Sequence, residues 1–281
     1  MNSKQFTDWC HIAADLRKPL IMGVLNVTPD SFSDAGLFMG PSAALLRADA
    51  MIQQGADIID IGGESSRPGA SAISCAEELS RVIPVIECIR TKHDICLSID
   101  TCKTEVMKAA VAAGASFIND INALQGIEAL SVVAALEVPV CLMHMQGVPE
   151  TMQNSPHYVA DMVDEINLFF HQRIEACEQA GIMRDRLILD PGFGFGKSVR
   201  HNLCLLKRLP EFQQHALPLL LGVSRKSTLG AILQKDVMDR LSGGLAVAIY
   251  AALQGVSIIR THDVDETKQA LQMLNAIVSV V

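Results

Sequence analysis

Short apolar runs alternate with longer amphipathic stretches along almost the whole chain. The apolar runs are nearly continuous, so strands formed by them would be buried on both faces, as in a parallel sheet. Segments with helical spacing lie between them, for example at 41–54, 157–180 and 264–278. The runs predict eight strands, at residues 20–27, 58–61, 95–100, 116–120, 138–145, 187–190, 219–224 and 256–262.

Three segments share one pattern, which supports this alternation. Residues 55–60, 114–119 and 255–260 each begin with a glycine that ends a helix, pass through a short turn and two large apolar residues, and end in a polar residue. Eight strand–helix units in 281 residues fit a (β/α)8 TIM-type barrel better than a doubly wound sheet. We expect a single α/β domain over residues 1–281, with a short N-terminal lead-in at 1–19, because no linker rich in Pro, Ser or charge divides the chain.

Composition and charge exclude several classes of protein. Hydrophobic residues make up 49% and charged residues 19%, which is enough apolar material for a large core. A formal net charge of -8 argues against a nucleic-acid partner. The eight cysteines contain no C-x-x-C pair, so a zinc site is not expected. Because no secretory signal begins the sequence, we expect a cytoplasmic protein.

Other conspicuous features are expected to be structural. The charge-free stretch 241–259 is long enough to raise the question of a membrane span, but its glycines and Gln254 divide it into a helix and a strand. We therefore expect it to be buried and expect no membrane association. Methionines at 51, 107, 162 and 273 fall at apolar helical positions and are expected in the core. Histidines at 11, 93, 171, 201 and 215 are expected at the surface or at helix caps.

Polar residues follow almost every predicted strand. In a (β/α)8 barrel the carboxyl ends of the strands meet at one face, which carries the ligand site. A single polar residue there is an ordinary solvated strand end, whereas eight together indicate a binding site. The strand ends read Asn26, Asp60, Asp100, Asn119, His144, Asp190, Ser224 with Lys226, and Arg260 with His262.

These side chains divide by chemistry. Carboxylates and an amide suit the donor-rich edge of a heterocycle, and this set is Asp100, Asn119 and Asp190. Asn26 offers a hard oxygen that suits Mg²⁺ when phosphate oxygens complete its shell. Positive charge suits a phosphate or diphosphate, although salt bridges to Asp60, Glu64 or Asp263 explain it equally well from spacing alone. This basic set is Arg67, Lys226, Arg260 and His262.

The segment RLILDPGFGFGKS at 186–198 invites a nucleotide-loop interpretation. A Walker A loop needs a glycine five residues before Gly196, and that position is Pro191. A dinucleotide fingerprint needs its third glycine where Lys197 or Val199 stands. Both interpretations are poor, so a Walker-type ATPase is not expected.

Eight motifs follow one another along the chain: NVTPDSFSD (26–34), DIGGESSRPGA (60–70), SIDT (98–101), IND (118–120), MHMQGVPETMQ (143–153), LDPGFGFGK (189–197), GVSRKS (222–227) and RTHD (260–263). Their order and spacing resemble those of the dihydropteroate synthase family over about residues 20–265. The resemblance implies a (β/α)8 transferase of folate biosynthesis. Such an enzyme condenses 6-hydroxymethyl-7,8-dihydropterin diphosphate with p-aminobenzoate, with Mg-assisted loss of diphosphate before the aryl amine attacks, and forms 7,8-dihydropteroate. It also implies a homodimer and a target of sulfonamides, which mimic p-aminobenzoate.

The resemblance also assigns roles by position, and it favours Lys226 over Lys197 as the lysine used in catalysis. The implied catalytic residues are Arg67, Lys226, Arg260 and His262. The pterin site would contain Asp100, Asn119, Asp190 and Lys226, with Met143 and Gly222 beside them. The diphosphate would bind Arg67, Arg260 and His262, with Mg²⁺ at Asn26. The p-aminobenzoate site would be bordered by Ser66, Pro68, Phe195 and Ser227.

Three positions depart from the family's usual pattern, and two related functions compete with synthesis. Ser66 stands where threonine is usual, Ala35 where a second glycine is usual, and Thr261 where an apolar residue is usual. A methyltetrahydrofolate-binding methyltransferase domain shares the barrel and its acceptor residues, but it does not need Arg67, the loop at 28–34 or the Arg260–His262 pair. A non-catalytic pterin-binding homologue would have lost loop or diphosphate residues, and none is lost.

Overall fold

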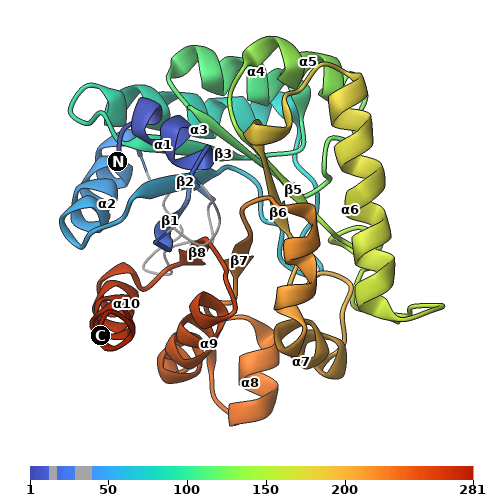
Figure 1. Ribbon diagram of the computed structural model, residues 1–281. Helices are drawn as coiled ribbons and strands as arrows, with labels where there is room; N and C mark the ends of the chain where they lie inside the picture. Colours follow the sequence, from blue (N-terminus) through green and yellow to red (C-terminus); the bar gives the residue numbers. More distant parts are fainter. Residues whose placement is uncertain (13–17, 29–39, 281) are drawn as a thin grey trace.

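The computed structural model describes residues 1–12, 18–28 and 40–280. These residues form one parallel sheet of eight strands in the order β6-β5-β4-β3-β2-β1-β8-β7. A bridge between Leu189 and Leu219 joins the two ends of this order and closes the sheet into a barrel (Figure 1). The strands are β1 (Leu20–Asn26), β2 (Ile58–Gly62), β3 (Cys96–Asp100), β4 (Phe117–Asp120), β5 (Val140–Met143), β6 (Leu187–Asp190), β7 (Leu220–Gly222) and β8 (Ile258–Thr261).

Helices follow the strands and cover the outside of the barrel, so the predicted (β/α)8 architecture is confirmed (Figure 1). Short 3-10 segments lie among them at Arg184–Arg186 (η3), Leu209–His215 (η4) and Val237–Asp239 (η5). The helices are α1 (Ser3–Cys10), α2 (Pro41–Gln53), α3 (Cys75–Arg90), α4 (Thr104–Ala113), α5 (Ala129–Leu136), α6 (Met162–Gln179), α7 (Val199–Lys207), α8 (Ser227–Leu233), α9 (Leu241–Leu253) and α10 (Val264–Val278).

Most strands are shorter than the apolar runs that predicted them. The run at 138–145 contains only the four residues of β5, which ends at Met143. His144 is still buried, and its backbone N–H donates a 2.9 Å hydrogen bond to the carbonyl of Asp190. An apolar run therefore records burial, which continues beyond the last residue that pairs regularly in the sheet.

Alternate residues along each strand point into the barrel, and they change from apolar to polar toward the carboxyl ends. The apolar layer takes residues from all eight strands: Leu20, Met22, Ile58, Cys96, Phe117, Cys141, Ile188, Leu220 and Ile258. Because side chains alternate with a period of two, residues two positions further along face the same interior. That next layer contains Asp60, Ser98, Asn119, Met143, Asp190, Gly222 and Arg260.

Helix α1 closes the N-terminal end of the barrel, where the sequence predicted only a lead-in segment. Phe6, Trp9 and Cys10 are buried in the same cluster as the apolar layer, and the ring centroid of Phe6 lies 5.0 Å from that of Phe117. The helix begins at Asn2 with a capping box. At eight residues it is too short for its apolar spacing to stand out in the sequence.

Two of the structural expectations need correction. Met273 is exposed on α10, whereas the other three methionines are buried as expected. His215 is buried instead of lying at the surface, and its Nε2 lies 2.9 Å from Oδ1 of Asn167, which gives the buried ring nitrogen a partner. The charge-free stretch divides into α9 and β8 as predicted, and no helix in the described ranges is long and apolar enough to cross a membrane. Ala35 and most of the predicted loop at 28–34 lie outside the described residues.

Candidate active site

The guanidinium of Arg260 joins three strands of the barrel, and Asp60 links a fourth to them. The Nε of Arg260 lies 2.6 Å from Oδ2 of Asp60, and its Nη2 lies 2.8 Å from Oδ2 of Asp100. The same Asp60 oxygen accepts a 3.2 Å hydrogen bond from Nδ2 of Asn119. Burial lowers the pKa of Arg260, but the two acids outweigh it and the net shift is upward. Burial raises the pKa of Asp100, although Arg260 opposes the shift.

Lys226 follows β7 and interacts electrostatically with Asp190 at the end of β6. The ammonium of Lys226 donates a hydrogen bond to the carbonyl of Phe193 and lies 4.6 Å from the ring centroid of Phe195. Oδ1 of Asp190 accepts a 2.7 Å hydrogen bond from the N–H of Gly192. Burial lowers the pKa of Lys226 to about 8, and burial raises the pKa of Asp190. A half-buried donor and a buried acceptor thus interact at the carboxyl ends of the strands, as recognition of a polar ring requires.

The glycine loop after β6 packs tightly against the segment that follows β5. Gly192 has a φ of +68°, and a Cβ at this position would lie 1.8 Å from the carbonyl oxygen of His144. Gly196 has a φ of +62°, and a Cβ there would lie 2.4 Å from the carbonyl oxygen of Gln146. Only glycine fits these two positions without a shift of the backbone. The tight turn presents Phe195 to a cavity at the carboxyl ends of the strands, which is the main cavity of the site.

Lys197 supports this loop from inside the protein. Its Nζ lies 3.0 Å from Nδ1 of His144 and donates a 3.1 Å hydrogen bond to the carbonyl of Phe195. Burial lowers the pKa of Lys197 to about 7 and that of His144 to about 2, so the histidine is neutral near pH 7. Lys197 does not line the main cavity, among the residues that the structure describes. Its contacts with His144 and Phe195 are those of a structural residue.

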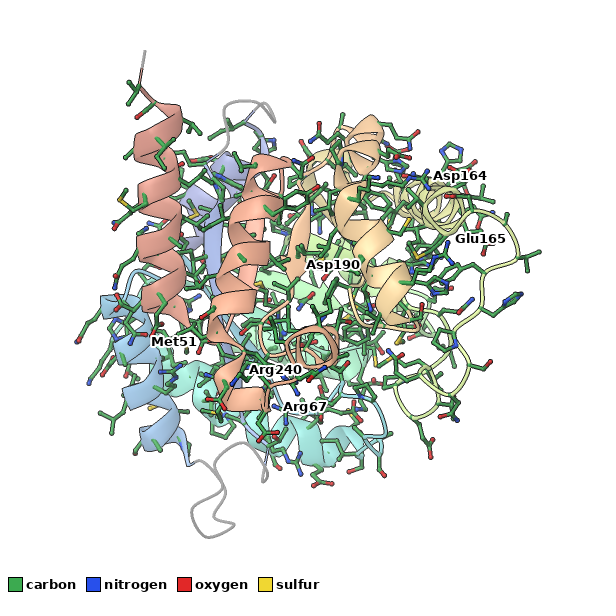
Figure 2. The ribbon with its side chains drawn as sticks, turned by 90° about the horizontal axis from the view of Figure 1, so that it is seen from below. Met51, Arg67, Asp164, Glu165, Asp190 and Arg240 are labelled. Atoms are coloured by element: carbon green, nitrogen blue, oxygen red, sulfur yellow. The ribbon has the colours of Figure 1, made fainter. Side chains whose placement is uncertain are left out.

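A cavity of about 400 Å³ lies at the carboxyl ends of the strands and falls within the usual size of small-molecule sites. Figure 2 shows two of its lining residues, Arg67 and Arg240, at one end of the molecule, with Asp190 nearer the middle. Among the described residues, Glu64 is the only acid in the lining, so the cavity suits an anionic ligand. The basic or imidazole side chains in the lining are Arg67, Arg225, Lys226, Arg240, Arg260 and His262.

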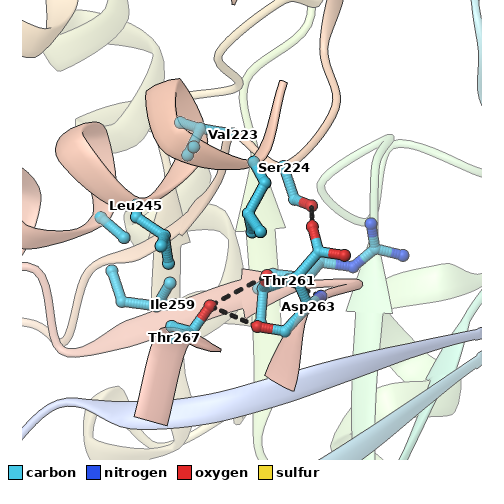
Figure 3. Close-up of a pocket in the computed structure, with 11 residues that line it drawn as sticks. Val223, Ser224, Leu245, Ile259, Thr261, Asp263 and Thr267 are labelled. Atoms are coloured by element: carbon cyan, nitrogen blue, oxygen red, sulfur yellow. Dashed lines mark hydrogen bonds between the residues drawn. The ribbon is translucent and has the colours of Figure 1, made fainter. Parts of the chain in front are cut away.

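His262 is held by a chain of polar contacts in the cavity wall and directly behind it. Its Nδ1 lies 3.0 Å from Oγ of Ser224, which donates a 3.4 Å hydrogen bond to Oδ2 of Asp263 (Figure 3). Asp263 also pairs with Arg225, with 2.5 Å between Oδ1 and Nη2. Burial lowers the pKa of His262 to about 3, and Arg260 adds to the shift. The imidazole is therefore neutral and oriented in the absence of an anion.

The unusual Thr261 is accommodated within the fold. Its Oγ1 accepts a 3.1 Å hydrogen bond from the N–H of Asp263 and lies 3.2 Å from Oγ1 of Thr267. These residues border a second cavity of about 10 Å³, which has room for about one water molecule (Figure 3). The hydroxyl that replaces the usual apolar side chain therefore has partners and fixes the backbone of Asp263.

Comparison with known proteins agrees with this geometry. The family described as "Pterin binding enzyme" matches residues 22–262. The chain is 52% identical to the dihydropteroate synthase of Escherichia coli (strain K12) over 265 residues, which are 94% of this chain and 94% of that protein. The chain belongs to the dihydropteroate synthase family.

Solved structures of dihydropteroate synthases share the fold. The Yersinia pestis dihydropteroate synthase, described with a sulfonamide drug complex, has a TM-score of 0.91 and 49% identity, covering 96% of this chain and 97% of the other. The Xanthomonas albilineans dihydropteroate synthase in complex with 7,8-dihydropteroate has a TM-score of 0.86 and 43% identity, covering 96% and 97%. The TIM-type barrel and the family predicted from the sequence are both confirmed.

The structure brings the predicted site residues of this chain together in two adjoining groups. Four of them lie among the inward residues of the barrel and do not line the cavity: Asp100, Asn119, Met143 and Asp190. Arg260 bonds Asp100, and Lys226 interacts with Asp190, so the groups meet at these two cations. Ten line the cavity: Asn26, Ser66, Arg67, Pro68, Phe195, Gly222, Lys226, Ser227, Arg260 and His262.

The sequence assigned neither Asp60 nor Lys103 a role in ligand binding. Asp60 is among the predicted strand ends and is named only as a possible salt-bridge partner, and it does pair with Arg260. A signal was present, because Asp60 lies two residues after the inward Ile58 on the same strand. Lys103 follows the strand tip Asp100 by three residues and shows no pattern of its own.

Proposed function

We propose that this chain condenses 6-hydroxymethyl-7,8-dihydropterin diphosphate with p-aminobenzoate, releasing diphosphate and forming 7,8-dihydropteroate. The observation that carries this proposal is the position of Arg260. This cation lines an electropositive cavity and also bonds Asp60 and Asp100 in the barrel interior. A ligand with a polar ring at one end and an anion at the other matches this arrangement.

The pterin ring binds in the barrel layer. Carboxylates accept pairs of N–H groups well, so Asp190 and Asp100 suit the 2-amino-pyrimidinone edge of the ring. Asn119 adds an amide, and Lys226 donates to ring acceptors. Met143 is buried beside them and packs against the ring face. In this proposal the ring takes over hydrogen bonds that Arg260 and Lys226 make within the protein.

The diphosphate binds Arg67, Arg260 and His262 at the cavity wall. The bond between the pterin methylene carbon and the diphosphate oxygen breaks, and its electron pair leaves with the diphosphate. The basic side chains stabilise the negative charge that develops on the leaving oxygens. The remaining cation is conjugated with the pterin ring. The lone pair of the neutral aryl amine then forms the new C–N bond, and the nitrogen loses a proton.

The p-aminobenzoate binds between the loop after β2 and the glycine loop. Ser66 and Pro68 border the cavity on the first loop, and Phe195 borders it on the second. Phe195 supplies an aromatic wall for the ring of the substrate. Ser227 lines the same cavity and offers a hydroxyl to the carboxylate.

Mg²⁺ fits this site only together with the diphosphate. Within the described ranges, no group of three His, Cys, Asp or Glu side chains could hold a metal ion. Asn26 offers one neutral oxygen at the cavity wall, so phosphate oxygens and water must supply the other ligands. When bound, the ion would neutralise charge on the departing diphosphate.

The proposal includes a homodimer in the cytoplasm. Helix α9 carries no charged residue, yet Ala246, Tyr250 and Leu253 are exposed on it, and Met273 and Ile277 are exposed on the adjoining α10. A second copy packed on this face would remove the apolar surface from water. Sedimentation should show a dimer, and Tyr250→Glu should shift it toward monomer.

The eight free cysteines support a reducing compartment.

A direct assay tests the proposed reaction. Purified protein is supplied with the pterin diphosphate, p-aminobenzoate and Mg²⁺, and both diphosphate release and dihydropteroate formation are measured. Turnover that requires both substrates supports the proposal. A folded sample without turnover would refute it. A methyltransferase domain or a non-catalytic homologue would bind the pterin without releasing diphosphate.

A further inference from the structure

Lys103 connects three elements near the cavity. It follows β3, and its Nζ lies 2.7 Å from Oε2 of Glu64 and 2.6 Å from Oε2 of Glu78. Glu64 begins the loop between β2 and α3, and Glu78 is completely buried on α3. One ammonium therefore fixes the start of this loop to the helix that follows it and to the end of β3.

The loop between β2 and α3 is fastened at its base. The carbonyl of Gly63 accepts a 2.7 Å hydrogen bond from Nη1 of Arg81, and Oε1 of Glu64 accepts a 2.7 Å hydrogen bond from the N–H of Ile73. Glu64 thus ties the start of the loop to its end. Residues 65–72 between these points are exposed or half-buried, and they carry the p-aminobenzoate residues Ser66 and Pro68.

The positive charge of Lys103 is needed to hold Glu64 in this position, because it lies between two carboxylates. Oε1 of Glu78 is buried without a hydrogen-bond partner in the described part of the chain, so the ion pair with Lys103 is the main compensation for burying this carboxylate. Without the ammonium, Glu64 would face an uncompensated negative charge. It would then lose its position, and the loop would lose its base.

We propose that Lys103 is a positioning residue for the p-aminobenzoate loop. It does not line the cavity, and it acts through Glu64, which does. The inference rests on the proposed function for the identity of the substrate. The effect of Lys103 on the mobility of residues 65–73 does not depend on that function.

The test uses variants that separate loss of the Lys103–Glu64 ion pair from burial of an unpaired Glu78 carboxylate. Lys103→Met with Glu78→Gln removes the ammonium and the buried carboxylate together, so Glu64 loses its ammonium partner while no unpaired charge is left buried. Glu64→Gln keeps an oxygen for Ile73 but loses the ion pair. The double variant should raise the KM for p-aminobenzoate by about 10-fold, and Glu64→Gln should raise it by about 3-fold. In both variants the KM for the pterin diphosphate should change less than about 2-fold. Lys103→Arg should restore values within about 3-fold of wild type.

Hydrogen exchange of the peptide that spans residues 65–74 gives a readout independent of catalysis. Exchange should be about 10-fold faster in the double variant, with β-strand peptides unchanged. Unchanged exchange, or an equal rise of both KM values, overturns the inference. If the double variant does not fold, Glu64→Gln decides by the same criteria. If exchange is faster in the double variant but the wild-type protein shows no turnover, the proposed function is refuted, whereas the positioning role of Lys103 stands.

Discussion

Nε of Arg260 lies 2.6 Å from Oδ2 of Asp60, although the two residues are 200 positions apart in the chain. Asp60 is completely buried, so this cation compensates a carboxylate that water cannot reach. The same side chain lines the cavity where the diphosphate is proposed to bind. Arg260 therefore serves both the stability of the barrel and the recognition of the anion.

Replacing Arg260 by alanine should reveal both roles. Arg260→Ala should weaken binding of the pterin diphosphate far more than binding of the free pterin, because only the diphosphate needs the cation. It should also lower the free energy of unfolding by about 3 kcal/mol, because Asp60 and Asp100 lose their partner. Calorimetric titration and urea denaturation measure the two effects. Equal losses for both ligands would place Arg260 outside the diphosphate site, and Arg260→Lys provides the control that keeps the charge.

Lys197 should make the stability of the protein depend on pH. Its pKa is lowered to about 7 by burial in the folded chain, whereas a lysine in the unfolded chain titrates near 10.4. Between these values the unfolded chain holds a proton that the folded chain has released, so rising pH favours the folded state by up to about 1.4 kcal/mol per unit. Lys197→Met should remove this increment.

Urea denaturation at several pH values between about 7 and 10 measures the difference. The free energy of unfolding of wild type minus that of the variant should increase with pH. His144, Asp190 and Lys226, which interact with Lys197, are present in both proteins, so their contributions largely cancel. Parallel pH profiles would show that Lys197 keeps an ordinary pKa in the fold.

Two glycines with positive φ should respond very differently to alanine. A Cβ at Gly192 would lie 1.8 Å from the carbonyl oxygen of His144, whereas a Cβ at Gly69 meets no atom within 4 Å. Gly69→Ala should therefore lower the free energy of unfolding by about 1 kcal/mol, from its φ alone. Gly192→Ala should lower it by about 3 kcal/mol or more, because the backbone must move. Thermal unfolding compares them, and similar losses would contradict the tight packing of the glycine loop.

Ser66 should influence discrimination between p-aminobenzoate and sulfonamides. It is half-buried at the rim of the cavity, so Ser66→Thr adds one methyl group there. The methyl should raise the inhibition constants of bulky sulfonamides relative to the KM for p-aminobenzoate, by about 3-fold. Steady-state inhibition of wild type and variant gives this ratio, with Ser66→Ala as the control for the hydroxyl. An unchanged ratio of the inhibition constants to the KM for p-aminobenzoate would contradict this role of Ser66.

The sequence by itself determined the barrel and the face that carries the site. Continuous apolar runs between helical segments are local consequences of burial, so they can be read from the chain without knowing any partner. Because side chains alternate along a strand with a period of two, Asp60 and Arg260 lie on the interior face, two residues beyond Ile58 and Ile258. The motifs at the strand ends then sufficed to recognise the family.

Tertiary structure alone decided which polar residues are partners. From spacing, the basic residues suited salt bridges and an anion site equally well, and in the fold Arg260 forms salt bridges within the cavity wall. The pairing of Lys103 with Glu64, and the closure of the barrel by α1, also depend on contacts between distant segments. A sequence pattern reports whether a residue is buried. It does not report which charge shares that space, because the partner is set by the closure of the whole sheet.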